Sequence, residues 1–544
     1  MRSARAIGEC LQVAGRTADN SRMGTMRALR WSMIAALGLS FGCATREAAL
    51  PVGHLPPPAG ELDLHTATAL AGTPNPVSAK PPASPLPTSQ SPVFAIPDEL
   101  PGANRPLVTL PKFDRDATPA EREKAIREAY PVLTPVVATS PGTGAALSLA
   151  ELESLALANS PAIKRAGADA ETGYGQVIQA GLRPNPTTGY QVDQVQPDLK
   201  IPEGSTASGA GQHGAFINLL IKTAGKLALA QKIAGFDYIN ALVAVRAARV
   251  SATTQVRSAY FTALVAQETL AVNKALADMA DELYGLQLKR VAAGVDTGYE
   301  PLQVYAQAII LRNAHAQGEA TARSAWKQLA AAVGQPDLPQ APLAGKASAA
   351  PPAIDEEAAR AWILERHTEL LTARNTLAQG QTNLLLQKKL PVPDLSTNQY
   401  HQYDNAAQVY QFGVQLGVQL PIFDRNQGNI RSAQSRIVSN GLALESTRND
   451  LFGRLAEAHG RYRANALAVA NYRDRILPSQ TQAYRAIVRR YQAEPDKVSF
   501  GDIVLAQQNV TQAMQSYLTA LDAQWRAVVD VANIVQIDEL YPSK

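Results

Sequence analysis

The chain has 544 residues, of which 46% are hydrophobic and 18% charged, and its formal net charge is +4. The hydrophobic fraction excludes a chain that is disordered throughout, and so small a charge over this length is not the basic footprint of a nucleic-acid-binding protein. The two cysteines, Cys10 and Cys43, cannot form a disulfide framework or a cysteine-based zinc site.

The N-terminal region has the pattern of a secretory signal. After Met26, two arginines precede an apolar run that is too short to span a membrane as a helix. The small Gly42 followed by Cys43 resembles the end of a bacterial lipoprotein signal, so we predict that Cys43 is acylated; an incidental Cys43 with ordinary cleavage nearby is the alternative. On this interpretation residues 1–25 are a misassigned extension and residues 26–43 are the signal peptide.

Prolines are distributed unevenly along the chain. Residues 44–145 are rich in Pro, Ala, Ser and Thr, whereas no proline lies between Pro202 and Pro301. The first stretch cannot bury enough apolar surface to fold alone, so we predict a disordered, extended leader with a short helix at residues 119–130. The second stretch permits very long helices, because proline breaks helix interiors.

The rest of the chain is predicted to contain one structural unit twice. Residues 160–186 align with residues 367–393, and each half reads as helix, strand, strand, long helix, turn and helix. We therefore expect two tandem repeats, at residues 146–345 and 346–540.

The clearest strand pattern lies at residues 410–420, where apolar side chains alternate with glutamine or glycine. Its length suits a tilted transmembrane β-strand of about 9 to 11 residues, with apolar side chains toward lipid and the others toward a lumen. A strand of a soluble sheet is the alternative. Further strands are predicted at residues 187–195, 215–221 and 395–403. Four aromatic residues are candidates for an interfacial belt: Tyr190, Tyr400, Tyr403 and Phe423.

Long helices are predicted after each pair of strands. Residues 226–290 contain almost no helix breaker, and residues 429–491 match them except for Pro478, which should kink the helix. Four strands cannot close a barrel, since closure needs at least about eight. The chain must then form oligomers, and three copies would supply twelve strands.

The sequence shows no pattern of an enzyme. Its seven histidines lack the paired spacing of a metal site, and no phosphate-binding glycine loop is present. We predict no catalytic residue, no cofactor and no resident metal.

Three motifs indicate a family. They are LPIFDRNQGNIRSAQ at residues 420–434, AGLRPNP at 180–186 and LALANSPAI at 155–163. With the repeat, they resemble the TolC-like outer membrane efflux proteins, or outer membrane factors, and within them the CzcC-type branch of heavy-metal cation efflux. The first-half counterpart of the FDRNQG turn, IKTAGK, has Ala224 where the family usually has the first of two glycines.

The resemblance implies a mostly helical α+β membrane protein that forms a homotrimer. Each protomer would give four strands to a twelve-stranded transmembrane β-barrel and its coiled-coil helices to a periplasmic α-barrel. It implies a passive outer membrane duct, with or without a lipid anchor, that docks with a periplasmic adaptor (membrane fusion protein) and an inner-membrane pump of the RND type to export heavy-metal cations or drugs. The channel of a type I protein secretion system and a lipid-anchored coiled-coil scaffold without a pore are the alternatives.

The resemblance also assigns roles to individual residues. The turns from barrel to helix contain Gly225, Lys226, Asp424, Arg425, Asn426 and Gly428. The hairpin tips at residues 290–302 and 490–502, predicted to dock the adaptor, contain Arg290, Gly294, Gly298, Arg490 and Asp502.

Two of the assigned residues have a simpler alternative. In a trimer, Asp502 would form a ring of carboxylates that attracts cations at the constriction of the tunnel; a carboxylate that only caps a helix is the equal alternative. Pro478 is predicted to be a hinge of the tip, and a static bend is its alternative.

Overall fold

The computed structural model describes residues 117–136, 145–195, 211–295, 298–494 and 497–540, together with residues 101, 103, 106 and 109. The predicted extension, the signal peptide, Cys43 and most of the predicted leader lie outside these residues.

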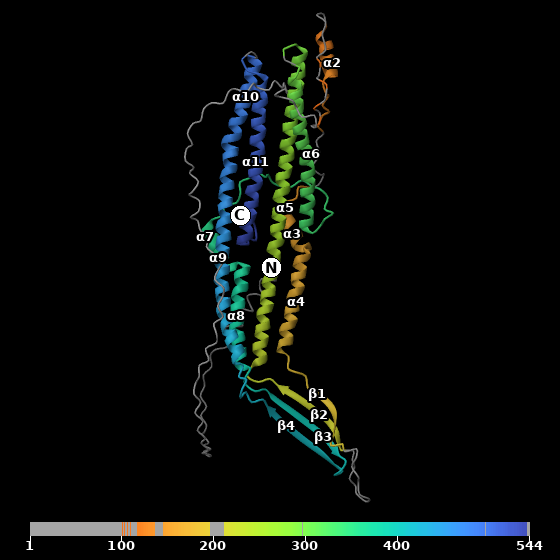
Figure 1. Cartoon of the computed structure of the whole chain (residues 1–544), viewed down its shortest axis with the longest axis vertical. Helices are drawn as coiled ribbons and strands as arrows, with labels where there is room; N and C mark the ends of the chain where they lie inside the picture. The colour runs from red at the N-terminus through yellow and green to blue at the C-terminus, as the bar shows by residue number, and fades with distance from the viewer. Residues whose placement is uncertain are drawn as a thin grey trace, which may run out of the picture. The chain divides into compact units, whose positions relative to one another are not determined.

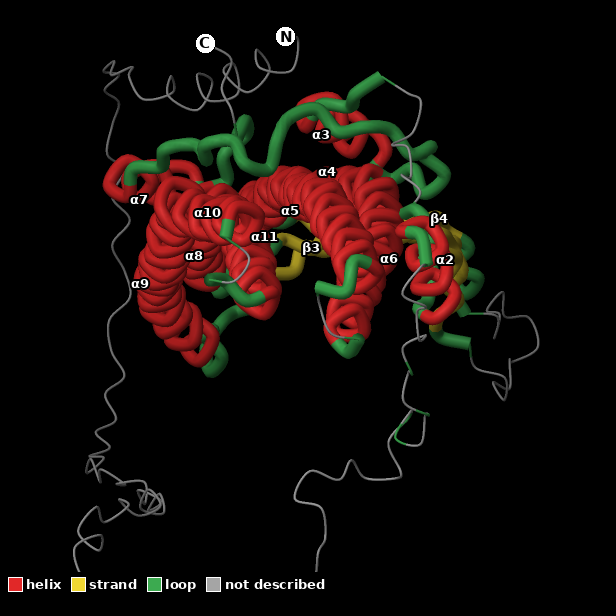
Figure 2. Tube along the Cα trace, turned by 90° about the horizontal axis from the view of Figure 1, so that it is seen from above, coloured by secondary structure: helices red, strands yellow, loops and turns green. Residues whose placement is uncertain are grey.

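Long helices make up most of the described chain, and a small sheet lies at one end of them (Figure 1). The first half contains α3 (Leu149–Asn159), α4 (Pro161–Gly181), β1 (Thr187–Asp193), β2 (Gln212–Ile221), α5 (Lys226–Ala292) and α6 (Glu300–Val333). The second half contains α7 (Glu356–Arg366), α8 (Thr368–Lys389), β3 (Leu395–Asp404), β4 (Val409–Val418), α9 (Gln427–Asn471), the π-helical turn η1 (Tyr472–Ile476), α10 (Leu477–Ala493) and α11 (Phe500–Val535). Seen along their length, the helices form a curved layer (Figure 2). Within the described ranges, no helix is apolar over enough of its length to cross a membrane.

Local sequence sets several helix boundaries. Pro161 and Pro301 stand in the first turns of α4 and α6, where the missing backbone N–H is not needed. Gly334 ends α6 with a φ of 81°, a conformation that glycine adopts without a steric penalty. No proline occurs within α5, which runs for 67 residues as the predicted breaker-free stretch requires.

The four strands form one antiparallel sheet in the order β1-β2-β3-β4. The two halves of the chain meet where β2 pairs with β3, from Gln212 opposite Asp404 to Ile221 opposite Leu395. All four predicted strands are present. β2 begins three residues before the predicted 215–221 because Gln212, His213 and Gly214, which lack an apolar alternation, still pair with the end of β3.

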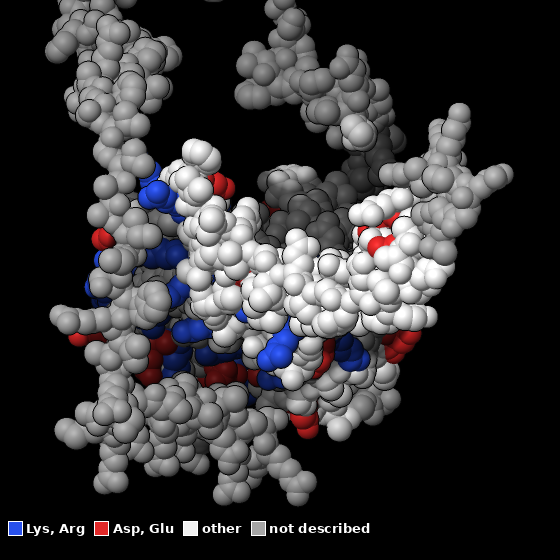
Figure 3. Space-filling model, turned by 90° about the horizontal axis from the view of Figure 1, so that it is seen from below, with Lys and Arg blue, Asp and Glu red and all other residues white. Residues whose placement is uncertain are grey.

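The two faces of the sheet differ in polarity. On β4, Tyr410, Phe412, Val414, Leu416 and Val418 share one face and are 53–74% exposed. The four strands contain no lysine or arginine, and their only carboxylates lie at the strand ends. Seen from the sheet end, charged side chains are sparse over a broad band of the surface (Figure 3).

One member of the predicted aromatic belt lies on the other face. Tyr400 pairs with Gly413 and therefore shares the face of the β4 glutamines, because paired residues of antiparallel strands point to the same side. Tyr403 pairs with Tyr410 and lies on the apolar face. The prediction grouped these tyrosines by position along the chain, whereas the period of two separates them.

The core lies where the helices of both halves meet at mid-length. Phe261 of α5 stacks on Trp525 of α11, with ring centroids 4.0 Å apart, and the Trp525 indole N–H donates to the Ala347 carbonyl at 2.7 Å. Arg257, which is only 1% exposed, pairs with Glu153 at 2.6 Å and donates to the carbonyls of Ile537 and Asp538. These contacts fix the end of α11 against α5 and α3.

The helical run at residues 429–491 is interrupted near Pro478, as predicted. The irregular turn η1 ends two residues before Pro478, which stands at the second position of α10. The irregularity lies on the N-terminal side because proline has no N–H for the carbonyl four residues earlier and its ring displaces that carbonyl. The role of Pro478 as a hinge stays a prediction.

A segment of the predicted leader packs onto the helices. We call residues 117–136 the strap; it contains α2 (Pro119–Ala129), which begins with a capping box between Thr118 and Glu121. Ile126 and Tyr130 are buried against the end of α5. This part of the leader therefore folds, because the hairpin of α5 and α6 supplies the apolar surface that the leader lacks.

Two tyrosine hydroxyls hold the strap in place. The Tyr130 hydroxyl donates to the Gly298 carbonyl in the turn between α5 and α6, and the Tyr284 hydroxyl donates to the Pro131 carbonyl, both at 2.7 Å. Burial, with Tyr305 and Tyr130 nearby, raises the pKa of Tyr284 to about 12. The hydroxyl thus stays a donor at every physiological pH.

The substitution Ile126→Ala should release the strap. Removing a fully buried aliphatic side chain costs about 2–5 kcal/mol, which is a large fraction of what one short helix can contribute. We expect faster tryptic cleavage within residues 117–136 of the purified protein, while the variant Glu128→Ala, at an exposed site of the same helix, is cleaved at the wild-type rate. Equal cleavage of both variants would contradict the packing of the strap.

Candidate functional site

The turn from β2 to α5 has an unusual backbone. Ala224 and Gly225 are both in the left-handed region, with φ of 56° and 72°. Glycine adopts this conformation freely, whereas other L-residues lose about 1–2 kcal/mol there. This explains why two glycines suit this turn. With Ala224 in place of the first glycine, the chain forms the same turn with some backbone strain.

A charged cluster fastens this turn to the connection between α8 and β3. Lys226, nearly buried, places Nζ 2.7 Å from Asp394 Oδ1 and 2.5 Å from the Val392 carbonyl. Lys222 Nζ lies 2.8 Å from Asp394 Oδ2, and the Thr223 N–H donates to Oδ1 at 3.0 Å. Burial alone would raise the pKa of Asp394, but these hydrogen bonds and cations outweigh it and hold the pKa well below its usual range.

The structure thus gives Lys226 a partner that the sequence did not indicate. Asp394 lies 168 residues away along the chain and belongs to no motif. The cluster joins the two halves where the sheet meets the helices. Replacing Lys226 or Asp394 alone would leave the other charge partly buried and uncompensated. This costs more stability than the loss of an exposed ion pair.

The matching turn of the second half relies on side-chain amides. Asn426, with a φ of 59°, donates from its side chain to the Gln387 carbonyl at 2.8 Å, and its backbone N–H donates to Asp424 at 2.8 Å. The Arg425 N–H donates to Gln427. Gly428, also predicted for this turn, lies within α9, where a Cβ would meet no atom within 4 Å, so its site does not require glycine sterically.

The two hairpin tips contact each other. Arg290, in the last turn of α5, lies over the ring of Tyr491 with Cζ 4.5 Å from the centroid. Gly294 has a φ of 75° and makes the first turn, and Gly298 accepts the strap hydrogen bond. Arg490 lies 3.9 Å from Glu494 on the exposed surface. The sequence predicted these tip residues, but not the contact with Tyr491 or the packing of the strap against the tip.

Asp502 caps the start of α11. Its carboxylate accepts from the Ser499 N–H at 2.9 Å and from the Ser499 hydroxyl at 2.8 Å, while the Asp502 N–H donates back to that hydroxyl. The capping alternative is therefore present in the geometry. A cap does not prevent the exposed carboxylate from acting on ions in an oligomer, and that role stays a prediction.

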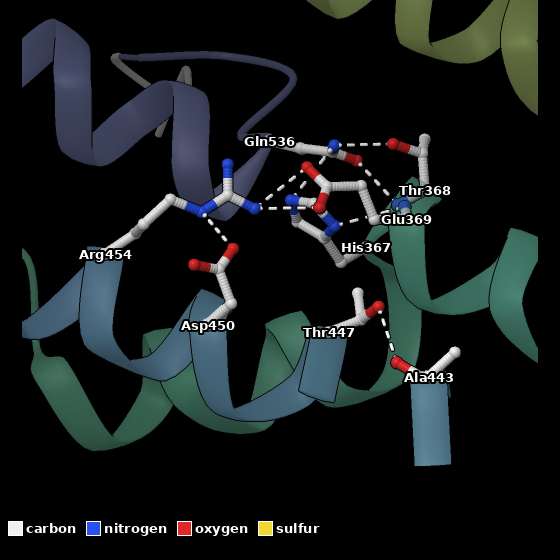
Figure 4. A network of polar contacts seen from close by, with 8 residues as sticks. All are labelled: His367, Thr368, Glu369, Ala443, Thr447, Asp450, Arg454 and Gln536. Carbon is white, nitrogen blue, oxygen red and sulfur yellow. Dashed lines mark hydrogen bonds and ion pairs between the residues drawn. The ribbon is translucent and has the colours of Figure 1, made fainter. Parts of the chain in front are cut away.

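A buried polar network joins the end of α11 to the start of α8 (Figure 4). The Gln536 side chain accepts from the Thr368 N–H at 3.2 Å and donates to the Thr368 hydroxyl at 2.8 Å. His367 Nδ1 accepts from the Glu369 N–H, and the Glu369 carboxylate pairs with Arg454 at 2.8 Å. Burial lowers the pKa of His367, which keeps its ring neutral and able to accept. This network fixes the corner between α7 and α8.

In the part of the chain that the structure describes, no three His, Cys, Asp or Glu side chains are grouped so as to hold a metal ion. The features that stand out are the sheet with its two faces, the turns beneath it and the paired tips.

Comparison with known proteins confirms the resemblance to outer membrane efflux proteins. Residues 152–335 match the family described as "Outer membrane efflux protein", which agrees with the predicted outer membrane location. Cobalt-zinc-cadmium resistance protein CzcC from Cupriavidus metallidurans is 25% identical over 396 residues, covering 72% of this chain and 90% of that protein.

Solved structures share the fold. CusC has 17% identity and a TM-score of 0.60, covering 78% of this chain and 99% of that chain. The CmeC outer membrane channel of Campylobacter jejuni has 17% identity and a TM-score of 0.58, with coverages of 72% and 87%. The open-state MtrE outer membrane channel of Neisseria gonorrhoeae has 16% identity and a TM-score of 0.58, with coverages of 71% and 88%. The mostly helical fold with a four-stranded sheet is thus that of TolC-like channels.

The substitution Ala224→Gly should stabilise the protein. Glycine relieves the strain of the left-handed backbone at this position. It also gives the unfolded chain more conformational entropy, which offsets part of that gain. We therefore expect the free energy of unfolding to rise by up to about 1 kcal/mol. Ala244→Gly, at an exposed site inside α5, should instead cost about 0.5–1 kcal/mol. Denaturant or thermal unfolding in detergent measures both, and a destabilised Ala224→Gly would contradict this reading of the turn.

Proposed function

We propose that this chain is the outer membrane subunit of a tripartite efflux system, in which a homotrimer serves as a passive exit duct. The observation that carries the proposal is the sheet, which exposes an apolar face on β4 and has none of the lysines or arginines of a soluble sheet. A transmembrane β-barrel needs such a face toward lipid and a polar face toward its lumen.

The ends of the sheet support the trimer. β1 and β4 each have one edge without a partner strand in the described sheet, and an unpaired edge presents free N–H and C=O groups to any neighbouring strand. Three copies would join edge to edge into twelve strands. The two halves have the same order of elements, except that α9, η1 and α10 stand where the first half has α5, and this order supports tandem repeats at residues 146–345 and 346–540.

The helices support a tunnel through the periplasm. α5 has 67 residues, which at about 1.5 Å per residue gives roughly 100 Å. The tips, at the end of the helices opposite the sheet (Figure 1), would dock the periplasmic adaptor, and an inner-membrane pump of the RND type would supply the energy. Acylation of Cys43, after removal of the residues that precede it, would add a lipid anchor.

Heavy-metal cations or drugs are the proposed cargo. The name of the CzcC protein refers to resistance to cobalt, zinc and cadmium, which favours metal cations. The alternative of a type I protein secretion channel keeps the same fold but lacks such support. A scaffold without a pore would leave the apolar face of β4 in water, which is unfavourable by the hydrophobic effect.

Purified protein should conduct ions in planar lipid bilayers, and deletion of its gene should sensitise cells to salts of cobalt, zinc or cadmium, or to drugs. Open ducts conduct because water fills the polar lumen. Protein that is folded but never conducts would contradict the proposed channel. If the deletion impaired only the secretion of proteins, and not resistance to metal salts or drugs, the type I alternative would be favoured.

In the same recordings, Asp502→Asn should lower the preference for cations over anions and weaken block by divalent cations. The amide oxygen of asparagine can still accept from the Ser499 N–H in the capping box, so the fold should persist while the proposed ring of charge is lost. Glu494→Gln, which removes another exposed carboxylate of the same tip, is the control. Unchanged selectivity and block would leave Asp502 as a helix cap only.

A further inference from the structure

The polar face of the sheet contains one row that does not follow the rest. Gly189 pairs with Phe216, Phe216 with Tyr400, and Tyr400 with Gly413. The row thus crosses all four strands, with aromatic residues on β2 and β3 and glycines on β1 and β4. The neighbouring rows carry mostly amides: Gln191, Gln402 and Gln411 on one side, and Asn218, Asn398 and Gln415 on the other.

The two rings lie flat over the two glycines. A Cβ built on Gly189 would lie 2.8 Å from Cζ of Phe216, and one built on Gly413 would overlap the Tyr400 ring. Each ring therefore crosses onto the neighbouring outer strand, Phe216 toward β1 and Tyr400 toward β4. The rings point away from each other and cover the sheet instead of standing upright on it.

Covering a glycine with an aromatic ring is a known way to stabilise a sheet. Stabilisation of the sheet accounts for the contact between ring and glycine. Inside a closed barrel, the same contact also determines how far the ring projects into the lumen. With the polar face inward, the three protomers would place six such rings around the lumen, three at each of two neighbouring heights because barrel strands are tilted. An upright ring would project into the passage, whereas a flat ring adds only its thickness.

We propose that Phe216 and Tyr400 set the width of the passage through the barrel, and that Gly189 and Gly413 keep these rings flat against its wall. This inference rests on the proposed channel function. Flat rings leave room for both proposed kinds of cargo, and among drugs they favour bulky organic cations, which also stack favourably on aromatic faces. The width of this row, and not only the tip, then limits what the duct can pass.

The test is the single-channel conductance of trimers in planar bilayers. Gly413→Ala removes the space that the Tyr400 ring occupies, so the ring must rise into the lumen and the conductance should fall about twofold. Gly413→Ala combined with Tyr400→Ala should restore the wild-type conductance or exceed it. Gly417→Ala, on the same face of β4, meets only the flexible Ser396 hydroxyl and should conduct like the wild type.

The outcomes separate the inference from the channel itself. A wild-type protein that does not conduct overturns the proposed function. A conducting wild type with an assembled Gly413→Ala trimer of unchanged conductance overturns this inference, as does a double variant that conducts less than the single one. If Gly413→Ala does not assemble, Gly189→Ala applies the same comparison to Phe216, with Gly189→Ala and Phe216→Ala combined as the rescue.

Discussion

An apolar face that has no protein partner is the constraint on which the rest of this structure depends. Tyr410, Phe412 and Leu416 are each at least 66% exposed, although apolar surface in water costs about 25 cal/mol per Å². Lipid against this face and a neighbouring copy at each edge would remove that cost. They would also leave the amide-rich face to line an aqueous passage, so one alternation of residues serves two environments.

The chain must also connect the short strands of the sheet to helices that are much longer and run in a different direction. The chain makes the change at two turns with left-handed residues, Ala224 with Gly225 in the first half and Asn426 in the second. The cluster of Lys226 and Asp394 joins the halves at the same level. At the far end, the strap and the stacking of Arg290 on Tyr491 hold the tips together. Both ends of the long helices are therefore fastened by contacts between segments distant in sequence.

Local pattern was enough to predict the elements but not their contacts. The period of two in β4 and the proline-free run of α5 are properties of single segments, so strands and long helices followed from the sequence. Tyr400 and Tyr403 were grouped in one aromatic belt although they are three residues apart on one strand, and the period of two puts them on opposite faces. The helix of the strap was predicted, but its packing and the role of Asp394 were not, because their partners lie far away in the chain and nothing in a proline-rich segment indicates the surface that it will meet.

We propose that the sheet is completed by other copies of the chain. Native mass spectrometry of the protein extracted from outer membranes in mild detergent would reveal those copies. We expect a complex of three copies. A species of one copy that remains folded, with the apolar face of β4 uncovered by any neighbour, would contradict it.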